Sequence, residues 1–139
     1  MIQKMPMSSG GVSVAQTDLW TNESPTTAIN NATDITLSDS ISNYDYLKFD
    51  FATYTNSSAK ESSLIISVDD FKKGTISAYN PLITLVSVVS AGNGSINRAI
   101  LYKNDTTITI DKGYYSGATG NEGAYSIPLK IIGLKGLTL

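Results

Sequence analysis

The strongest constraint on the fold is a series of short runs of β-branched and aromatic residues, separated by turn residues, that begins near Asp18. In residues 44–54 (YDYLKFDFATY), Leu47, Phe49 and Phe51 alternate with other residues. Because successive side chains of a strand point to opposite faces, this alternation predicts a strand with one buried face. No comparable helical stripe occurs anywhere in the chain. The sequence therefore predicts an all-β fold, an antiparallel β-sandwich of jelly-roll-like type.

The other runs extend this prediction. Residues 62–68 predict a hairpin partner for 44–54, with Leu64, Ile66 and Val68 on one face, and residues 80–92 predict a strand that starts at Pro81 and alternates through Leu82, Thr84, Val86 and Val88. Residues 98–103 and 106–113 predict a hairpin that turns at Asn104-Asp105, with Ala99 and Leu101 facing Ile108 and Ile110. A final strand begins at Ser126, with Ile127, Leu129 and Ile131 on one face. Single turns are predicted at residues 24–27 and 68–71.

The domain organisation follows from length and local composition. With 139 residues the chain can form one domain with a real core. Residues 1–16 show no sustained periodicity, and we interpret them as a flexible N-terminal arm that a partner would order, leaving residues 17–139 as the sandwich domain. An edge strand around Val12 and Val14 is the alternative.

Charge and cysteine content narrow the classes of partner. The net charge is −2, and basic and acidic residues are interspersed, so nucleic acid is not an expected partner. The start of the chain has no apolar segment typical of a signal peptide, and no long apolar run predicts insertion into a membrane. There is no cysteine, so no disulfide framework is possible and packing or assembly must supply the stability.

The chain also lacks histidine, which removes the usual general base and the commonest metal ligand. Asp69 and Asp70 are adjacent, so on a strand they would point to opposite faces, and we interpret them as a solvated pair that helps to end a strand. We therefore expect no enzyme activity, no cofactor and no bound metal.

Surface side chains suited to binding remain. The candidate ligand-binding residues are Arg98, a fork-shaped donor, Tyr114 and Tyr115 at the end of a strand, and Asn121 in the loop that follows. The tyrosines could equally be core residues, and Arg98 could instead pair with Asp111 across the hairpin. The single tryptophan, Trp20, is interpreted as a core or subunit-interface residue.

Several motifs together resemble a known family. The chain is similar to the compact β-domain at the distal end of bacteriophage tail fibre and other minor virion proteins over roughly residues 17–136, in the runs LWTNESPT (19–26), TDITL (33–37), ISNYDYLKFDF (41–51), NRAILY (97–102), TTITI (106–110), GYYSG (113–117) and SIPLKIIGLKG (126–136). The resemblance implies a homo-oligomer, commonly a trimer, on the surface of a virion, and it supplies no catalytic residues.

Two functions follow from this resemblance. The first is a tail-fibre-like adhesion module that binds host-surface glycan through loops and gains strength from several copies. The alternative is a capsid decoration or head-fibre protein, without ligand binding, that docks to other phage structural proteins through its N-terminal arm. A glycan hydrolase is the third and least favoured reading.

Overall fold

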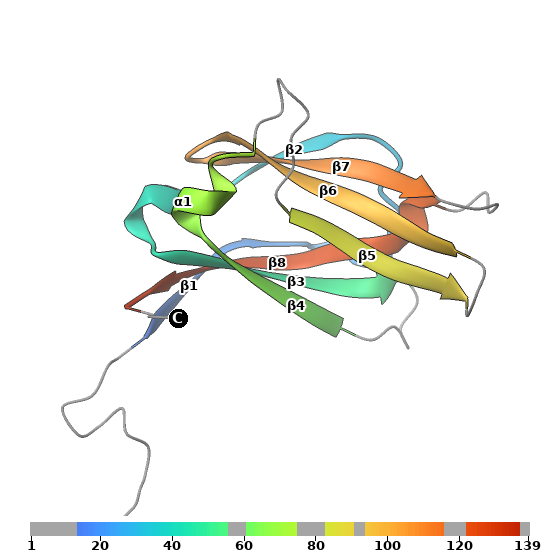
Figure 1. Ribbon diagram of the computed structural model, residues 1–139, viewed down its shortest axis with the longest axis horizontal. Helices are drawn as coiled ribbons and strands as arrows, with labels where there is room; N and C mark the ends of the chain where they lie inside the picture. The colour runs from blue at the N-terminus through green and yellow to red at the C-terminus, as the bar shows by residue number, and fades with distance from the viewer. Residues whose placement is uncertain (1–13, 56–60, 75–82, 91–93, 116–121, 137–139) are drawn as a thin grey trace, which may run out of the picture.

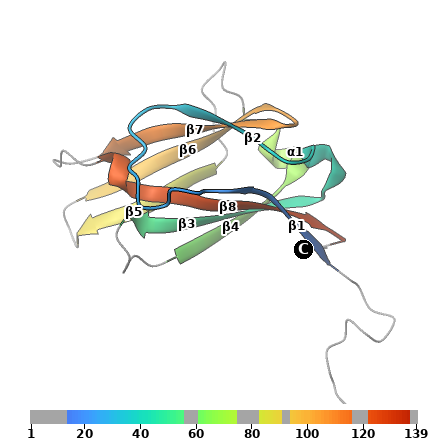
Figure 2. The same cartoon turned by 180° about the vertical axis from the view of Figure 1, so that it is seen from behind.

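The computed structural model describes residues 14–55, 61–74, 83–90, 94–115 and 122–136. Two antiparallel sheets of four strands face each other, which confirms the predicted all-β sandwich (Figures 1 and 2). In spatial order, the first sheet contains β1 (Ala15–Thr21), β8 (Tyr125–Lys135), β3 (Tyr46–Tyr54) and β4 (Glu61–Ser67). The second contains β2 (Thr33–Thr36), β7 (Thr107–Tyr115), β6 (Gly94–Asn104) and β5 (Ile83–Ser90).

The strand order combines long-range and local pairing. Pairing of β1 with β8 and of β2 with β7 joins strands from opposite ends of the chain, and this is the jelly-roll-like feature. In contrast, β3 and β4 form a hairpin in the first sheet, and β5, β6 and β7 form a meander in the second. The sandwich consequently has two pairs of edge strands, β4 with β5 on one side and β1 with β2 on the other.

The core lies between the sheets and is closed at one end by α1 (Val68–Phe71). Leu47, Phe49 and Phe51 are all buried, as their alternation predicted. The ring of Phe71 lies 5.5 Å from that of Phe49 between centroids, so the short helix packs directly on β3. The helix starts where predicted because the hydroxyl oxygen of Ser67 accepts a hydrogen bond from the Asp70 amide.

The β6–β7 hairpin turns at residues 105–106, one residue later than predicted, because β6 ends at Asn104 and β7 begins at Thr107. The side-chain oxygen of Asn104 accepts a hydrogen bond from the Thr106 amide at 3.0 Å, a local bond that favours a turn. Asp105 then anchors the turn to the rest of the molecule, since its carboxylate accepts hydrogen bonds from Ser42, Tyr102 and Lys72. These three donors lower the pKa of Asp105 to about 2.

The register of this hairpin differs from the prediction. Ile110 pairs with Ile100 and Ile108 pairs with Tyr102, so Ala99 and Leu101 point to the opposite face. The reason is that the turn lies one residue later and that the ladder is irregular between Tyr102 and Asn104. A β-bulge inserts one residue, and this reverses the alternation of faces beyond it.

A similar irregularity changes β8. The register shifts between Asp50 and Phe51, so Pro128 rather than Ile127 lies opposite the core residue Phe51. The prediction that Ile127 shares a face with Ile131 is therefore wrong.

Three further predictions are corrected at the ends of strands. Val68 belongs to α1 rather than continuing β4, and the buried face of β5 is formed by Ile83 and Leu85, whereas Thr84 and Val86 are exposed. Strand β1 starts at Ala15, which pairs with Lys135, so the predicted arm extended too far. Pro81, Leu82 and residues 1–13 lie outside the described residues, as does the side chain of Val88. The predicted turn at 24–27 is present, with Thr27 donating its amide hydrogen to the Ser24 carbonyl.

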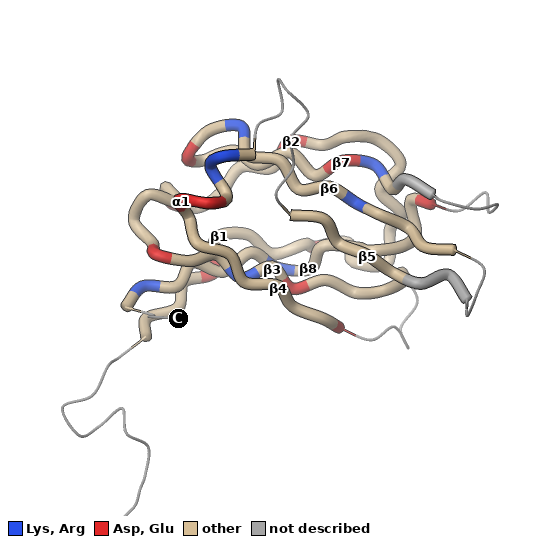
Figure 3. The backbone as a smooth tube through the Cα atoms, viewed as in Figure 1, with Lys and Arg blue, Asp and Glu red and all other residues tan. Residues whose placement is uncertain are grey.

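The distribution of charge matches the sequence pattern. Figure 3 shows basic and acidic residues scattered over both sheets, without a stripe of one sign among the described residues. Within the same described ranges, neither α1 nor any other helical segment has the length and apolar character needed to cross a membrane.

Candidate functional site

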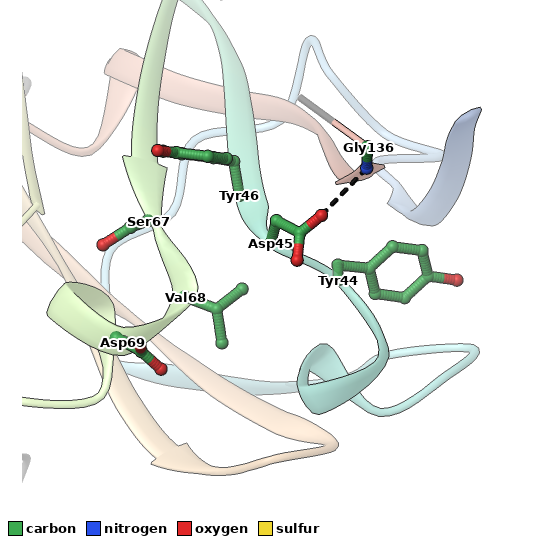
Figure 4. A pocket seen from close by; sticks show the side chains of 7 residues that line it. All are labelled: Tyr44, Asp45, Tyr46, Ser67, Val68, Asp69 and Gly136. Atoms are coloured by element: carbon green, nitrogen blue, oxygen red, sulfur yellow. Dashed lines mark hydrogen bonds between the residues drawn. The ribbon is translucent and has the colours of Figure 1, made fainter. Parts of the chain in front are cut away.

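An open cleft of about 500 Å³ lies at the end of the sandwich where β3 begins and β4 ends. Figure 4 shows Asp45 between Tyr44 and Tyr46, with residues of β4 and α1 across from them. Its walls combine two phenol rings, two carboxylates and a hydroxyl, contributed by Tyr44, Asp45, Tyr46, Ser67, Val68, Asp69 and Gly136.

The hairpin register brings these residues together. Tyr46 pairs with Ser67, so the start of β3 and the end of β4 meet at one edge of the sheet. The Val68 amide then donates to the Asp45 carbonyl at 3.0 Å, which fixes the start of α1 against β3. The two carboxylates of the cleft, Asp45 and Asp69, are thereby held on adjoining segments.

Asp45 is an exposed carboxylate in the lining of the cleft. Its carboxylate accepts a hydrogen bond from the Gly136 amide at 2.8 Å and lies 3.7 Å from the Lys135 ammonium group. Gly136 has a φ of 85°, a left-handed conformation that glycine adopts without steric cost. The cleft therefore depends on the chain turning at the end of β8.

Tyr44 is fixed by packing and by a hydrogen bond. Its hydroxyl donates to Asp39 at 2.9 Å, and its ring lies against the backbone of Gly133. A Cβ built on Gly133 would come within 2.6 Å of two ring atoms. Only glycine at this position lets the ring lie so close to β8.

The Asp69 carboxylate and the Tyr46 hydroxyl are the polar groups of the cleft that can bond to a ligand. Asp69 is exposed in the first turn of α1, and within the described residues its carboxylate makes no hydrogen bond or ion pair. Its neighbour Asp70 is used structurally, in an ion pair with Lys73 at 2.7 Å. Tyr46 is half-buried, and no described residue bonds to its hydroxyl.

This set of groups is suited to a polyhydroxylated ligand. Carboxylates accept hydrogen bonds from hydroxyl groups, and an aromatic ring can stack on the C–H face of a sugar. In contrast, no cluster of three acidic side chains that could hold a metal ion occurs in the described ranges.

The predicted ligand-binding role of Arg98 is wrong. Its side chain is fully buried (0% exposed) on the core side of β6, where ligand cannot reach it. All five of its N–H groups are occupied by backbone carbonyls at 2.7–3.1 Å, those of Ser126, Ile29, Asp111, Gly123 and Tyr125.

The alternative reading, that Arg98 interacts with Asp111, is closer to the structure. Burial lowers the pKa of Arg98 to about 10, and the charge of Asp111 opposes this shift. The guanidinium group is thus still protonated at neutral pH. It joins β6, β7, β8 and the segment that precedes β2 into one buried network.

Of the remaining predicted site residues, the structure describes only the backbone of Tyr114 and Tyr115. The backbone of Tyr114 and Tyr115 pairs with Asn97 and Ile96 at the far end of β7, but their side chains lie outside the described residues. Asn121 also lies outside them. Trp20 is half-buried and packs against the core, in line with its interpretation as a packing residue.

Sequence reasoning missed the cleft although it had a usable signal. The tripeptide YDY at the start of one predicted strand faces the SVDD segment at the end of its predicted hairpin partner. Pairing of the two strands would by itself have placed these aromatic and acidic residues together.

Comparison of the chain with protein-family models gave no match, and comparison with curated proteins gave none. The resemblance to phage tail fibre domains therefore depends on the strand and turn motifs of the sequence itself.

Proposed function

We propose that the chain is an adhesion module of a bacteriophage virion and that it binds a host-surface glycan in the cleft between β3 and α1. The observation that supports this most directly is that the half-buried Tyr46 and the carboxylates of Asp45 and Asp69 line the same cleft. The cleft replaces the loop site that the sequence predicted around Arg98.

We further propose that the cleft binds glycan without hydrolysing it. The chain has no histidine and no cysteine, so any proton transfer would depend on carboxylates alone. Release of sugar from a glycan by the purified protein, abolished by Asp69→Asn, would contradict this part of the proposal.

The module is proposed to act as a homo-oligomer, in which several weak sites add together. Among the described residues, the large apolar side chains that are exposed are Leu64 and Ile65 on β4 and Val86 on β5, with 37, 46 and 49% exposure. These two edge strands lie on the same side of the sandwich (Figure 1). Unpaired edges with apolar side chains favour association of chains. Light scattering tests this: a trimer is expected, and a monomer at micromolar concentration contradicts it.

A glycan array with purified chain tests the binding site. We expect Tyr46→Ala and Asp69→Asn each to weaken retention about tenfold or more, a loss of about 1.4 kcal/mol. Both residues are at least partly exposed, so the unfolding midpoint should not change. Asp18→Asn is the matched control, because Asp18 is an exposed carboxylate on β1, outside the cleft.

Retention of glycan by both cleft variants at the level of the native chain would contradict the site. Retention of no glycan, together with capture of the chain by phage shells that is lost on removing residues 1–13, would favour the decoration role instead.

A further inference from the structure

A second hollow, of about 190 Å³, lies on the β1–β2 side of the sandwich. Its walls are the indole of Trp20 and the side chains of Ile29, Ile35 and Ile110, and the hydroxyl-bearing residues Ser24 and Thr27 also line it. We propose that this hollow is a binding site for a small, neutral, predominantly apolar ring that carries a hydroxyl group. The site shares no residue with the cleft and does not depend on the proposed glycan function.

The wall between β1 and β2 is held in place by hydrogen bonds. Asn22 donates to the Pro128 carbonyl at 2.9 Å and accepts from the Ser24 amide at 2.8 Å. Further along, the Thr27 amide donates to the Ser24 carbonyl at 3.0 Å. These bonds close the segment into a fixed turn beside Trp20.

Ile29 completes this wall and is fixed from the core side. Its amide donates to the Gly123 carbonyl at 2.8 Å, and its carbonyl accepts from the buried Arg98 at 3.1 Å. Both backbone groups of Ile29 are therefore occupied, and its side chain is held toward the hollow. A pocket built in this way needs no ordering of the chain when ligand binds, which favours affinity.

The lining determines the class of ligand. No charged side chain contributes to it, so neither an anion nor a cation would find a partner there. The hollow is partly open to solvent, and its volume exceeds that of an engineered apolar cavity of about 150 Å³ that binds benzene. A hollow of about 190 Å³ is thus large enough for a six-membered ring. The exposed Ser24 and Thr27 can bond to one hydroxyl group of that ring.

The single tryptophan makes the proposal directly measurable, because all tryptophan emission comes from the wall of the hollow. The intact chain is titrated with cyclohexanol, and with myo-inositol, which has the same ring size but a hydroxyl on each carbon. We expect a saturable change of Trp20 emission with cyclohexanol and at least tenfold weaker binding of myo-inositol. Cyclohexanol should also raise the melting temperature, since it binds only the folded state.

Two variants locate the binding. Thr27→Phe places a ring at the hollow and should weaken cyclohexanol binding at least tenfold, whereas Thr26→Phe, at the neighbouring exposed residue that does not line it, should bind as the native chain does. If Thr27→Phe does not fold, Ser24→Phe fills the hollow from another wall residue. An unsaturable response, equal binding of myo-inositol, or undiminished binding by a folded filling variant would each overturn the proposal.

Discussion

Replacement of Arg98 by methionine tests whether the buried guanidinium group holds one end of the sandwich together. Methionine keeps an unbranched chain but has no charge and no N–H donor. The substitution therefore leaves five buried or half-buried carbonyls without their donor, and it leaves Asp111, which is 5% exposed, without the positive charge beside it.

The expected loss of stability is large. Hydrogen bonds to a charged group are worth about 1.5–3 kcal/mol each, so a simple sum over the five bonds of Arg98 approaches the whole stability of a typical domain, about 5–15 kcal/mol. Such contributions are not additive, because water can enter and the backbone can relax. Removal of one partner of a buried charge pair costs about 3–5 kcal/mol, which we take as the lower limit. Arg98→Lys should be less damaging, since an ammonium group keeps the charge and three of the donors.

Urea unfolding followed by Trp20 emission measures the effect. With a slope of about 2 kcal/mol per molar urea, Arg98→Met should lower the midpoint by at least about 1.5 M, or prevent folding. Lys73→Met is the control, because Lys73 is an exposed cation whose removal should leave the midpoint unchanged. A midpoint for Arg98→Met within about 0.5 M of the native value would refute the reasoning, because it would show that the carbonyls find other partners.

Two further predictions concern the turn and the cleft. The pKa of Asp105 is lowered to about 2, so the stabilising contribution of its carboxylate is present above about pH 4 and is lost as the pH falls toward 2. Asp105→Asn should remove this pH-dependent part of the free energy of unfolding, about 1 kcal/mol after allowance for solvent screening. Acid titration of the unfolding midpoint measures it, and an unchanged pH profile would contradict the assigned bonds. Gly133→Ala should cost about 1–3 kcal/mol in urea unfolding, because its Cβ displaces the Tyr44 ring. The double variant with Tyr44→Ala should cost less than the sum of the two single changes, and strict additivity would show that the ring is not the obstacle.

The local pattern of the sequence was sufficient for the strands but not for the bulges. Alternation in residues 44–54 identified β3 and its buried face, and Asn104-Asp105 located the β6–β7 turn to within one residue. The register near Ile100 and the face of Ile127 were wrong, because a bulge adds a residue without any local signature.

The candidate site depended on contacts that a single sequence does not specify. Arg98 looked like a surface donor because arginine is rarely buried, and its five acceptors are backbone carbonyls from segments far apart in the chain. Since every residue has a carbonyl, no residue type marks the ones that will surround a guanidinium group.

The sequence by itself determined the class of the fold, the hairpins and the absence of cysteine and histidine chemistry. These properties depend on residue type and on spacing along one or two neighbouring segments. The tertiary structure decided that Arg98 is a structural residue and that Tyr46 and Asp69 line a cleft instead. Burial and convergence of side chains result from the packing of two sheets and from the pairing of strands distant in sequence. Neither the packing nor the long-range pairing can be read directly from the local sequence pattern.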